Sequence, residues 1–471
     1  MDMIVLGSGE YRMDSDFYSD EIMETHDPRG FTLREAIHEA KRCLNCAKPL
    51  CRTGCPIENE IPEFIKELAN GNIGEASAVI ARRSNLPAVC GRVCPHEKQC
   101  EGACILNRKG EGIKIGKLER FIADVDADFE LTPPPKPVDT KGKVAIIGSG
   151  PAGLTVAGDL AKKGYKITVF DAQEEPGGVL MYGIPEFRLA KEVVRREIKR
   201  IRRLGVEFIN NIMVGQDLTL QDIFAQNFDA IFIATGNSVA KSLDIDGKNL
   251  VGVLEATYLL QMVSLATQGS VDQSEVPIKS GDDVVIIGAG NVAMDAGRSA
   301  IREGAASVTV VCREAEDKVA ALESEVEAAK AEGVKFRSLR QPTKFLGSIK
   351  VRGLQCEILH FDENAKLTGT GVHDFIKADK IVIAIGQRPA ARIISTTKGI
   401  EVDEGGFVKT RSRPYGMTTL HGVFSGGDVV HGPATVVRAM KDAKKVAMGI
   451  AQYVEAKKLM QECGLKIEKD R

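Results

Sequence analysis

The sequence lacks several features that would identify a partner or a compartment. Lys and Arg total 63 and Asp and Glu total 65, so a net charge of −2 offers no basic field for nucleic acid or an anionic membrane. No apolar run approaches the ~18 residues that a membrane span needs. The opening stretch, MDMIVLGSGEYRMDSD, lacks the basic and apolar regions of a signal peptide. We therefore expect a cytoplasmic protein.

Cysteine is present but unevenly distributed. Eight of the 11 cysteines lie within residues 43–104, whereas Cys312, Cys356 and Cys463 are scattered. In a reducing compartment, such a dense group of thiols indicates metal ligation rather than disulfides. The first four follow C-x2-C-x4-C-x3-C-P, which is closer to bacterial iron–sulfur ligation than to the separated pairs of structural zinc sites. The residues favour two four-iron clusters, with zinc as the alternative.

The chain is long enough for roughly three domains of ~150 residues each. Helical spacing surrounds the cysteines, and a Pro-rich stretch follows at 128–142. Beyond it, β-rich runs alternate with helices, which indicates an α/β fold with parallel sheets. An internal repeat pairs residues 143–172 with 283–314, and residues 229–236 with 379–386. We interpret the repeat as two Rossmann-like dinucleotide-binding domains, the second inserted in the first.

A glycine-rich turn follows the first strand of each repeat. The first, GSGPAG, stands between the apolar strand VAII and a helical segment, which is the context that the dinucleotide fingerprint requires. Asp171 ends the next strand, where a carboxylate can hydrogen-bond a ribose hydroxyl. The loop residues expected to face a pyrophosphate at the helix N-terminus are Gly148, Ser149, Gly150, Pro151, Ala152 and Gly153.

The second turn, GAGNVA, carries alanine at the third glycine position, an allowed variant. Aligning the repeats places Cys312 at the position of Asp171, with Arg313 directly after it. Without the carboxylate, a ribose 2′-phosphate meets no repulsion and Arg313 can pair with it, which favours NADP over NAD. Glu314 weakens this preference and leaves NAD possible. The residues assigned to this site are Gly288, Gly290, Arg313 and Gly386.

Two dinucleotide sites in one chain imply hydride exchange between a nicotinamide and a flavin. The second domain contains no C-x-x-C, which argues against a dithiol reductase of the thioredoxin reductase type. Electrons that reach the flavin must therefore leave by another path, and the cysteine block provides a candidate.

Seven motifs, in this order, resemble one known family across nearly the whole length. They are RCLNCAKPLCRTGCPIENEIPEFI, LPAVCGRVCPHEKQCEGAC, IGKLERF, GSGPAGL, GGVLMYGIPEFRL, GAGNVAMD and FSGGDVVHGPATVV. They resemble the small (β) subunit of bacterial glutamate synthase. They equally resemble the NADPH/FAD subunit of the electron-bifurcating NADH-dependent ferredoxin:NADP oxidoreductase. The cysteine block also resembles the N-terminal domain of dihydropyrimidine dehydrogenase.

The resemblance implies how the cluster ligands divide. One 4Fe–4S cluster would bind Cys43, Cys46, Cys51 and Cys104. The second would bind Cys55, Cys94, Cys100 and Glu119, the last from the I-G-x-L-E segment. A count of thiols alone gives the fourth place to Cys90, so Cys90 remains the alternative to Glu119. A carboxylate ligand would shift the potential of the second cluster.

The resemblance also implies residues around the two nucleotides. Gly178, Leu180 and Arg188 would form the flavin pocket, and Val214 would contact the adenine. The remaining FAD residues would be Thr235, Gly236, Gly427, Asp428, Thr435 and Val436, and the nicotinamide nucleotide would meet Asn291, Val292 and Asp295. One departure concerns the stretch CREAEDKVAALE, because family members commonly carry two arginines there. This places the 2′-phosphate site in doubt.

The expected function is that of an oxidoreductase subunit with FAD, two 4Fe–4S clusters and NADP(H). It would exchange hydride between NADP(H) and FAD and pass electrons to a redox partner subunit, in an electron-bifurcating transhydrogenase or, alternatively, in glutamate synthase. No acid–base residue is implied. The expected organisation is a helical cluster domain (1–127), a linker (128–142), an FAD-binding domain (143–250 and 387–471) and an NAD(P)H-binding domain (251–386).

Overall fold

The computed structural model describes residues 30–132, 140–390, 393 and 396–465, which form two compact units. The first unit contains the described residues up to 181, residues 187–236, and those from 389 onward. The second contains residues 182–186 and 237–388. The centre of the expected linker, and both ends of the chain, lie outside the described residues. None of the described helices combines the length and apolarity needed to cross a lipid bilayer.

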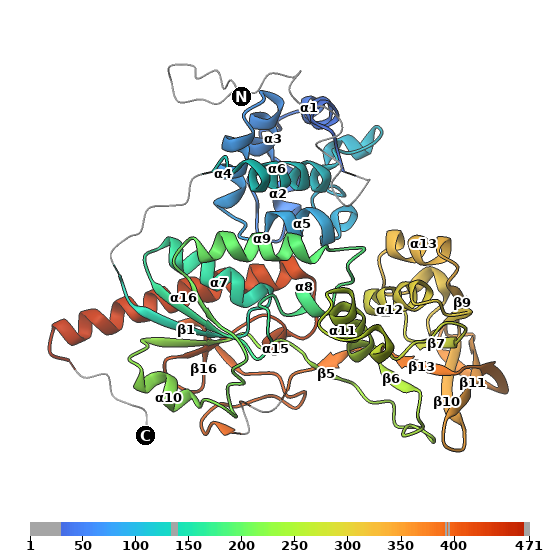
Figure 1. Ribbon diagram of the computed structural model, residues 1–471. Helices are drawn as coiled ribbons and strands as arrows, with labels where there is room; N and C mark the ends of the chain where they lie inside the picture. Colours follow the sequence, from blue (N-terminus) through green and yellow to red (C-terminus); the bar gives the residue numbers. More distant parts are fainter. Residues whose placement is uncertain (1–29, 133–139, 391–392, 394–395, 466–471) are drawn as a thin grey trace. The chain divides into compact units, whose positions relative to one another are not determined.

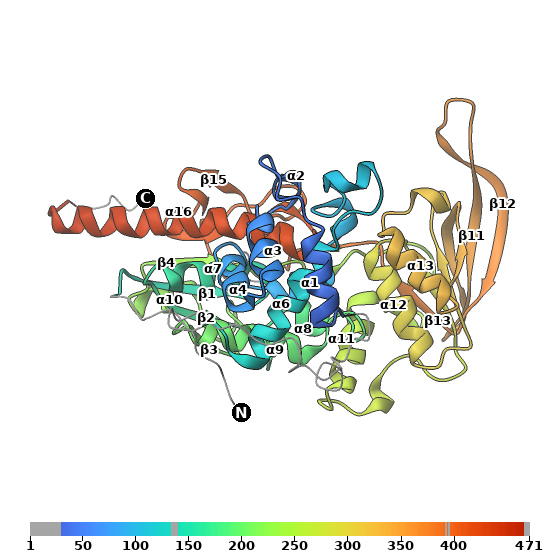
Figure 2. The same cartoon turned by 90° about the horizontal axis from the view of Figure 1, so that it is seen from above.

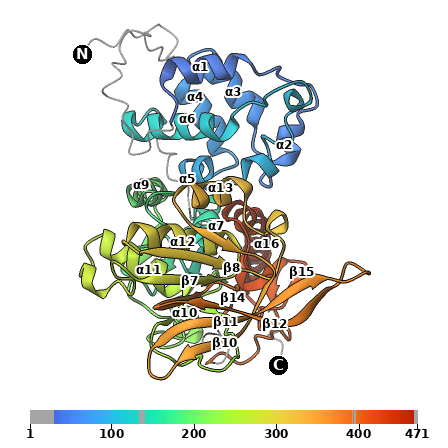
Figure 3. The ribbon, with the colours of Figure 1, turned by 90° about the vertical axis from the view of Figure 1, so that its right-hand side faces the viewer.

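The first unit begins with a small helical domain that carries the eight clustered cysteines. Ile61, Phe64 and Leu68 recur at helical spacing and are buried, so α3 turns one apolar face to the domain core. Figure 3 shows α1, α3, α4 and α6 packed together. The helices are α1 (Leu33–Lys41), α2 (Leu50–Gly54), α3 (Ile61–Ala69), α4 (Ile73–Ala81), α5 (Pro87–Val93) and α6 (Ile115–Phe129), with 3-10 turns η2 (His96–Lys98) and η3 (Ile105–Arg108).

The same unit contains a seven-stranded sheet in the order β15-β16-β17-β4-β1-β2-β3. From β3 to β17 the strands are parallel, and β16 and β15 continue antiparallel. On β1, Val144 lies opposite Ile167 of β2 and Ala230 of β4. The strands are β1 (Lys143–Ile147), β2 (Lys166–Phe170), β3 (Glu207–Ile209), β4 (Ala230–Ile233), β15 (Thr410–Ser412), β16 (Tyr415–Thr418) and β17 (Val423–Ser425).

Helices cover this sheet, as the nearly continuous apolar sequences of its parallel strands require. The helices α7 and α16 pack against each other on one face (Figure 1). The first begins at Pro151, a residue favoured at the first helical position, directly after the glycine loop. The helices are α7 (Pro151–Lys162), α8 (Val179–Tyr182), α9 (Lys191–Arg202), α10 (Leu220–Ala225), α15 (Asp428–His431) and α16 (Val436–Glu462).

The second unit repeats the plan with a five-stranded parallel sheet in the order β6-β13-β7-β8-β9. It adds the antiparallel sheet β10-β11-β12, whose long β11–β12 ribbon is clear in Figure 2, and the pair β14-β5. The strands are β5 (Val239–Ala240), β6 (Val253–Glu255), β7 (Asp283–Ile287), β8 (Ser307–Val311), β9 (Lys335–Arg337), β10 (Arg340–Gly347), β11 (Val351–Phe361), β12 (Leu367–Lys377), β13 (Lys380–Ile383) and β14 (Gln387–Arg388). The helices are α11 (Ala256–Thr267), α12 (Asn291–Arg302) and α13 (Glu323–Ala331), with 3-10 turns η4 (Gln273–Glu275) and η5 (Glu316–Lys318).

Candidate functional site

Four of the clustered cysteines line one cavity in the helical domain. Cys43 and Cys46 lie in the loop after α1, Cys51 lies in α2, and Cys104 directly precedes η3. The cavity measures about 470 Å³ with its opening included, and isoleucines from α3 and from the segment that leads into α6 form part of its wall. These four cysteines are the set that the resemblance implies for one cluster.

The electrostatics of this group suit a metal centre. Burial raises the pKa of Cys43, and it raises the pKa of Cys51 to about 11, with further increases from the neighbouring thiols. Such thiols keep their protons at neutral pH unless a bound metal displaces them. Iron–sulfur clusters are held by cysteine thiolates, so this donor set fits a 4Fe–4S cluster.

A second group gathers between α2, α5 and α6. Cys55 follows α2, Cys94 follows α5, Cys100 is buried after η2, and Glu119 projects from the first turns of α6. The glycine at position 91 brings two of these helices together, since a Cβ there would lie 2.6 Å from the backbone nitrogen of residue 120. The structure therefore brings together the four residues implied for the second cluster, with Cys90 close by.

Glu119 is the most unusual member of this group. It is 7% exposed, and burial, with Glu197 nearby, raises the pKa of its carboxyl to about 8. Asn59 opposes the increase by donating a hydrogen bond from Nδ2 to Oε1 at 3.3 Å. Burial raises the pKa of Cys55 and Cys100, and the neighbouring Cys90 together with burial raises that of Cys94; the Glu119 carboxylate raises all three further. A buried cation would relieve this concentration of potential negative charge.

Within the described ranges, no three His, Cys, Asp or Glu side chains converge as they would around a single metal ion. A four-iron cluster is larger than a single metal ion, so the side chains that ligate it lie farther apart and need not converge on one point. The fit of both groups therefore rests on which donors they bring together and on how deeply those donors are buried.

The first glycine loop joins β1 to α7. Gly148 has φ +97°, and a Cβ there would lie 2.6 Å from the carbonyl oxygen of Ala234 at the end of β4, so the turn requires glycine. A Cβ on Gly153 would lie 2.0 Å from the carbonyl oxygen of Gly148. By contrast, a Cβ on Gly150 would meet nothing within 4 Å. The open space beside the α7 N-terminus is where the fingerprint places a pyrophosphate.

Asp171 supports this loop from the end of β2. Its Oδ2 accepts hydrogen bonds from the backbone N–H of Ser149 at 2.7 Å and from the Ser149 hydroxyl, and its Oδ1 accepts from the N–H of Gln173 at 2.9 Å. The Ser149 hydroxyl oxygen also accepts from the N–H of Gly177 at 2.8 Å. A Cβ on Gly178 would lie 2.9 Å from the Cα of Gly150. The expected flavin-pocket segment therefore packs directly on the glycine loop, and Asp171 holds that loop in place.

The C-terminal part of the chain completes this site. The N–H of Gly427 donates to Oδ2 of Asp442 at 2.7 Å, and a Cβ on Gly427 would lie 2.9 Å from the Cβ of Ala152. Burial raises the pKa of the adjacent Asp428 to about 6. Thr435 precedes α16, and its Oγ1 is buried without a hydrogen-bond partner among the described residues. Such an atom is expected to find a partner when the site is filled, so these residues fit a bound dinucleotide.

The other residues expected around FAD lie on the same unit. Leu180 and Val436 are buried, and Val214 belongs to the apolar core that includes Phe170. Arg188 is half-buried, and Thr235 and Gly236 follow β4, the glycine with φ +61°. The side chain of Val214 lies within that core.

The second glycine loop reproduces the first. A Cβ on Gly288 would lie 2.6 Å from the carbonyl oxygen of Ala384, whereas a Cβ on Gly290 would meet nothing within 4 Å. In α12, Oδ1 of Asn291 accepts from the N–H of Leu322 at 2.9 Å, and Asp295 is buried. The remaining expected residues differ in exposure and backbone geometry: Val292 is 38% exposed, Arg313 is exposed, and Gly386 has φ +110°.

Two further arginines approach Cys312, at the position expected for the 2′-phosphate. The N–H of Cys312 donates to the carbonyl oxygen of Arg337 at 3.2 Å, and the N–H of Arg340 donates to the carbonyl oxygen of Cys312 at 2.9 Å. Arg340 pairs with Asp374 through Nε at 2.9 Å, and Nη1 of Arg337 lies 3.6 Å from the same carboxylate. The sequence alone does not reveal these residues, because their approach depends on the pairing of β8 with β9.

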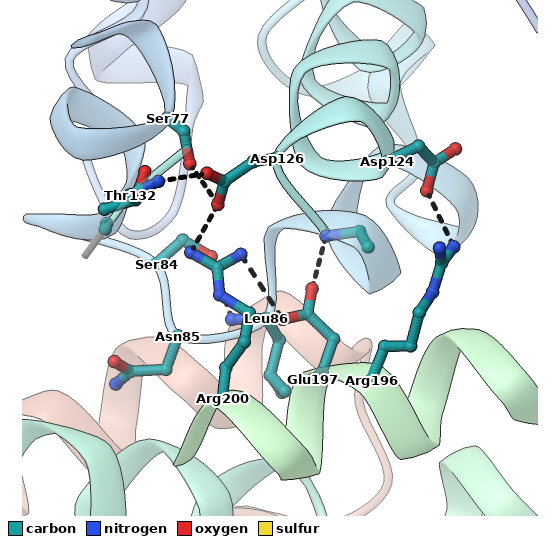
Figure 4. A network of polar contacts seen from close by, with 12 residues as sticks. Ser77, Ser84, Asn85, Leu86, Asp124, Asp126, Thr132, Arg196, Glu197 and Arg200 are labelled. Carbon is teal, nitrogen blue, oxygen red and sulfur yellow. Dashed lines mark hydrogen bonds and ion pairs between the residues drawn. The ribbon is translucent and has the colours of Figure 1, made fainter. Parts of the chain in front are cut away.

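Figure 4 shows a second feature missed in the sequence, a polar network between α6 and α9. Oδ2 of Asp126 lies 3.3 Å from Nη2 of Arg200 and accepts from the hydroxyl of Ser77 at 2.8 Å. Oε1 of Glu197 accepts from the backbone N–H of Ala88 at 2.6 Å. The alternating acids of ADVDADFE and the basic run RREIKRIRR are the signal that marks it. The network joins the helical domain to the flavin half of the unit.

Comparison with known proteins agrees with this geometry. Residues 21–130 match the model for dihydropyrimidine dehydrogenase domain II, 4Fe-4S cluster, and residues 142–443 match that for pyridine nucleotide-disulphide oxidoreductase. The chain is 37% identical to the glutamate synthase (NADPH) small chain of Halomonas elongata, over 92% of this chain and 93% of that one. For the same protein of Escherichia coli the identity is 34%, over 92% and 94%. The chain belongs to the glutamate synthase small-subunit family.

Membership in the glutamate synthase small-subunit family identifies the chain as an NAD(P)H-dependent flavin and iron–sulfur oxidoreductase. Its cofactors are 4Fe–4S, FAD and NAD(P), as predicted. The fold also resembles FprA from Mycobacterium tuberculosis in complex with NADPH, with a TM-score of 0.55 and 20% identity over 70% of this chain and 87% of that one. The predicted architecture, a helical iron–sulfur domain followed by Rossmann-like domains, is confirmed.

Proposed function

We propose that this chain exchanges hydride between NADP(H) and FAD and passes the electrons through two 4Fe–4S clusters to a partner subunit. The assembly would be an electron-bifurcating ferredoxin, NAD and NADP transhydrogenase. The observation that carries the proposal is the division of the clustered ligands into two groups. One group lines an open cavity, and the other, in which Cys100 and Glu119 are buried, lies beside the residues that join the helical domain to α9 and α16.

The residues of this chain would bind and orient the cofactors. The α7 N-terminus and the loop around Gly150 would bind the FAD pyrophosphate, and the backbone at Gly427, anchored by Asp442, would approach the same cofactor. The buried hydroxyl of Thr435 would gain a hydrogen-bond partner there. Bound FAD would take up hydride as an electron pair and release single electrons, which the clusters would carry.

Arg313 would select NADP(H). Its exposed guanidinium follows Cys312, which stands at the end of β8 in place of the carboxylate that would repel a 2′-phosphate, although Glu314 is adjacent. Arg337 and Arg340, whose backbones pair with Cys312, share the one carboxylate of Asp374, so one positive charge at this edge of the sheet is not offset by that carboxylate. These groups would take the place of the second arginine that the family motif carries.

The cavity of the first group is the proposed exit for electrons. Leu44, Leu50 and Ile105 line it and are large apolar side chains with 61%, 43% and 39% exposure. Lys48 also lines it, and Arg108 is exposed nearby in η3. These exposed apolar side chains and their basic neighbours would complement a partner subunit that carries an acidic surface over its redox centre.

Glutamate synthase is the second candidate assembly. The observation that favours it is the name of the relatives, since a small chain implies a separate large chain. Residues 43–119 would serve the same purpose in either assembly, because each needs electrons delivered to another subunit. The two candidates differ in what that subunit contains.

The deciding experiment is purification from anaerobic cells with identification of the partner by mass. A partner with an NADH-binding flavin or iron–sulfur domain would support the transhydrogenase and exclude glutamate synthase. A partner with an FMN barrel and an amidotransferase domain would do the reverse. The electron path is tested on the isolated chain, where NADPH under argon should bleach first the flavin and then the iron–sulfur absorbance. Flavin bleaching alone would contradict the path.

A further inference from the structure

Asn85 lies on the short segment between α4 and α5, and its side chain points toward the helices of the flavin half (Figure 4). The residue is 8% exposed. Its Nδ2 donates to the carbonyl oxygen of Thr155 at 3.2 Å and to Oδ1 of Asp159 at 2.8 Å, both on α7. Its Oδ1 accepts from Nζ of Lys162, the last residue of the same helix, at 2.7 Å. Nζ of Lys444 on α16 holds Asp159 from the other side, 2.8 Å from Oδ2. One amide of the helical domain thus uses both its N–H groups and its oxygen on α7.

Gly158 makes room for this side chain. A Cβ at position 158 would lie 2.6 Å from Cγ of Asn85, 2.8 Å from its Oδ1 and 2.9 Å from its Nδ2. Glycine inside a helix disfavours the helix relative to alanine. The close approach of Asn85 explains why α7 carries glycine there.

Two other helices of the flavin half hold the same part of the helical domain. Oε1 of Glu197 on α9 accepts from the N–H of Ala88 at 2.6 Å. The S–H of Cys90 in α5 donates to Sδ of Met440 on α16 at 3.6 Å. The start of α5 is therefore held by α9 and α16, and Asn85 directly before it is held by α7.

The two helices that meet through Asn85 lead to the two proposed redox sites. α7 begins beside the loop around Gly150, which would bind the FAD pyrophosphate, and Gly158 follows about two turns later. α5 follows Asn85 and ends next to Cys94, a proposed ligand of the second cluster. The contact of Asn85 with Gly158 therefore sets how the helix before the proposed ligand lies against the helix at the proposed flavin site.

We propose that Asn85, seated against Gly158, is a positioning residue for electron transfer from the flavin to the second cluster. This inference rests on the proposed electron path and ligand set. The step moves one electron at a time from reduced FAD to an oxidised cluster, and NADPH is the source of the electron pair. When both electrons have left, the flavin is oxidised again and its proton has gone to water. The rate of such a step depends on how two groups held by different domains are placed and oriented.

The Asn85 side chain can be removed without leaving a charged neighbour alone. Asp159 would keep its contact with Lys444, and Lys162 would keep the carbonyl oxygen of Ala81, to which its Nζ donates at 2.8 Å. The amide is itself uncharged. A truncation at this position should therefore change the placement of the two domains and leave the potentials of the cofactors as they are.

The test is stopped-flow absorbance of the full chain with FAD and iron bound, mixed with NADPH under argon. Bleaching of the flavin reports hydride transfer, and the later bleaching of the iron–sulfur absorbance reports electron transfer. Asn85→Ala should keep its iron, its FAD and its rate of flavin bleaching, and should slow cluster bleaching about tenfold. Gly158→Ala leaves Asn85 intact but fills its space, so it should slow the same step although alanine favours the helix. Lys163→Ala is the matched control, because it changes an exposed residue directly after α7 and should alter neither rate.

The two substitutions should not add. In the double variant Asn85→Ala/Gly158→Ala, the truncated side chain no longer meets the methyl group added at position 158. Cluster bleaching should then be no slower than in Asn85→Ala alone, because both changes act on one contact. Effects that multiply would show two independent causes and contradict the inference.

Three further results would overturn the inference. An unchanged rate of cluster bleaching in Asn85→Ala would leave Asn85 with a packing role alone. Equal slowing of flavin bleaching, or a changed midpoint potential of either cluster in an EPR redox titration, would assign the effect to something other than placement. If Asn85→Ala does not fold, an unchanged rate in Gly158→Ala decides against the inference equally. Failure of the underlying electron path is distinguishable, because the wild-type chain would then bleach its flavin and not its clusters.

Discussion

The carboxylate of Glu197 on α9 caps the N-terminal end of α5, where its Oε1 accepts the N–H of Ala88 at 2.6 Å. The same carboxylate is 2% exposed, lies 3.8 Å from Arg200, and has its pKa raised by burial. Through it, the flavin half of the first unit holds the helix that carries Cys90 and leads to Cys94.

Replacement of this carboxylate should loosen the helical domain. We expect Glu197→Ala to lower the free energy of unfolding by about 1–3 kcal/mol, because the buried N–H of Ala88 loses its acceptor and Arg200 keeps only Asp126 as a partner among the described residues. Urea unfolding of the purified protein measures the change. Glu192→Ala on the same helix is the control, since that side chain is 65% exposed and should cost little. Equal effects of the two variants would contradict the prediction.

Asp442 should control how firmly FAD is held. Its Oδ2 accepts from Gly427, and its Oδ1 accepts from the hydroxyl of Tyr415 at 2.7 Å and lies 3.0 Å from Nε2 of His431. Asp442→Ala should free the 427 backbone and weaken FAD binding about tenfold, which is about 1.4 kcal/mol. Flavin fluorescence during dilution measures the release. Lys441→Ala changes the exposed neighbour and should leave the affinity unchanged.

Asp428 should make the stability of the FAD-free protein depend on pH. Burial raises its pKa from 3.8 to about 6, with partial relief from a backbone hydrogen bond and from His431. Because the folded pKa exceeds the unfolded one, this carboxyl contributes stability below pH 3.8 that is lost as the pH rises through 6. Thermal unfolding between pH 4 and 7 should show the decrease, and Asp428→Asn should flatten it. An identical slope in that variant would assign the effect to another group.

Arg313 should decide between the two nicotinamide nucleotides. Arg313→Ala should raise KM for NADPH about tenfold and leave KM for NADH nearly unchanged, because only NADPH carries the 2′-phosphate that the guanidinium would bind. Steady-state reduction of an artificial electron acceptor gives both constants. Glu314→Gln is the matched variant, and removal of its negative charge should lower KM for NADPH. An equal rise in KM for NADPH and NADH in Arg313→Ala would exclude a contact between Arg313 and the 2′-phosphate.

Iron content should separate the two ligand groups. Cys104→Ala should remove the first cluster and Glu119→Ala the second, each with a loss of about four irons from a total of about eight. Chemical iron analysis and EPR of the reduced protein report which cluster remains. Cys356→Ala is the control, because that buried cysteine lies in β11 of the second unit. Retention of all iron in Glu119→Ala would exclude the carboxylate as a ligand.

The parts that the sequence could predict are the local ones. The glycine loops at 148–153 and 288–290 depend on residues close in the chain, so their strand, turn and helix were readable from spacing. The division of the cluster ligands into two groups is implied by the family resemblance. A count of thiols alone favours Cys90 over Glu119 as the fourth ligand of the second cluster. The hydrogen bond from Gly427 to Asp442 spans 15 positions and depends on how α16 packs beside the glycine turn, which no local sequence pattern reveals. The contact of Cys90 with Met440 spans 350 positions and was likewise invisible.

The strand order of the first sheet has a consequence for folding during translation. β17 pairs with β4, although 192 positions separate the paired residues, such as Ser425 and Ile233. Because the whole nucleotide-binding insert is translated between them, the ribosome must release almost the entire chain before the flavin half can close. The helical domain and α9 are synthesised before α16, so the hydrogen bond of Ala88 with Glu197 can form earlier in synthesis than the contact of Cys90 with Met440.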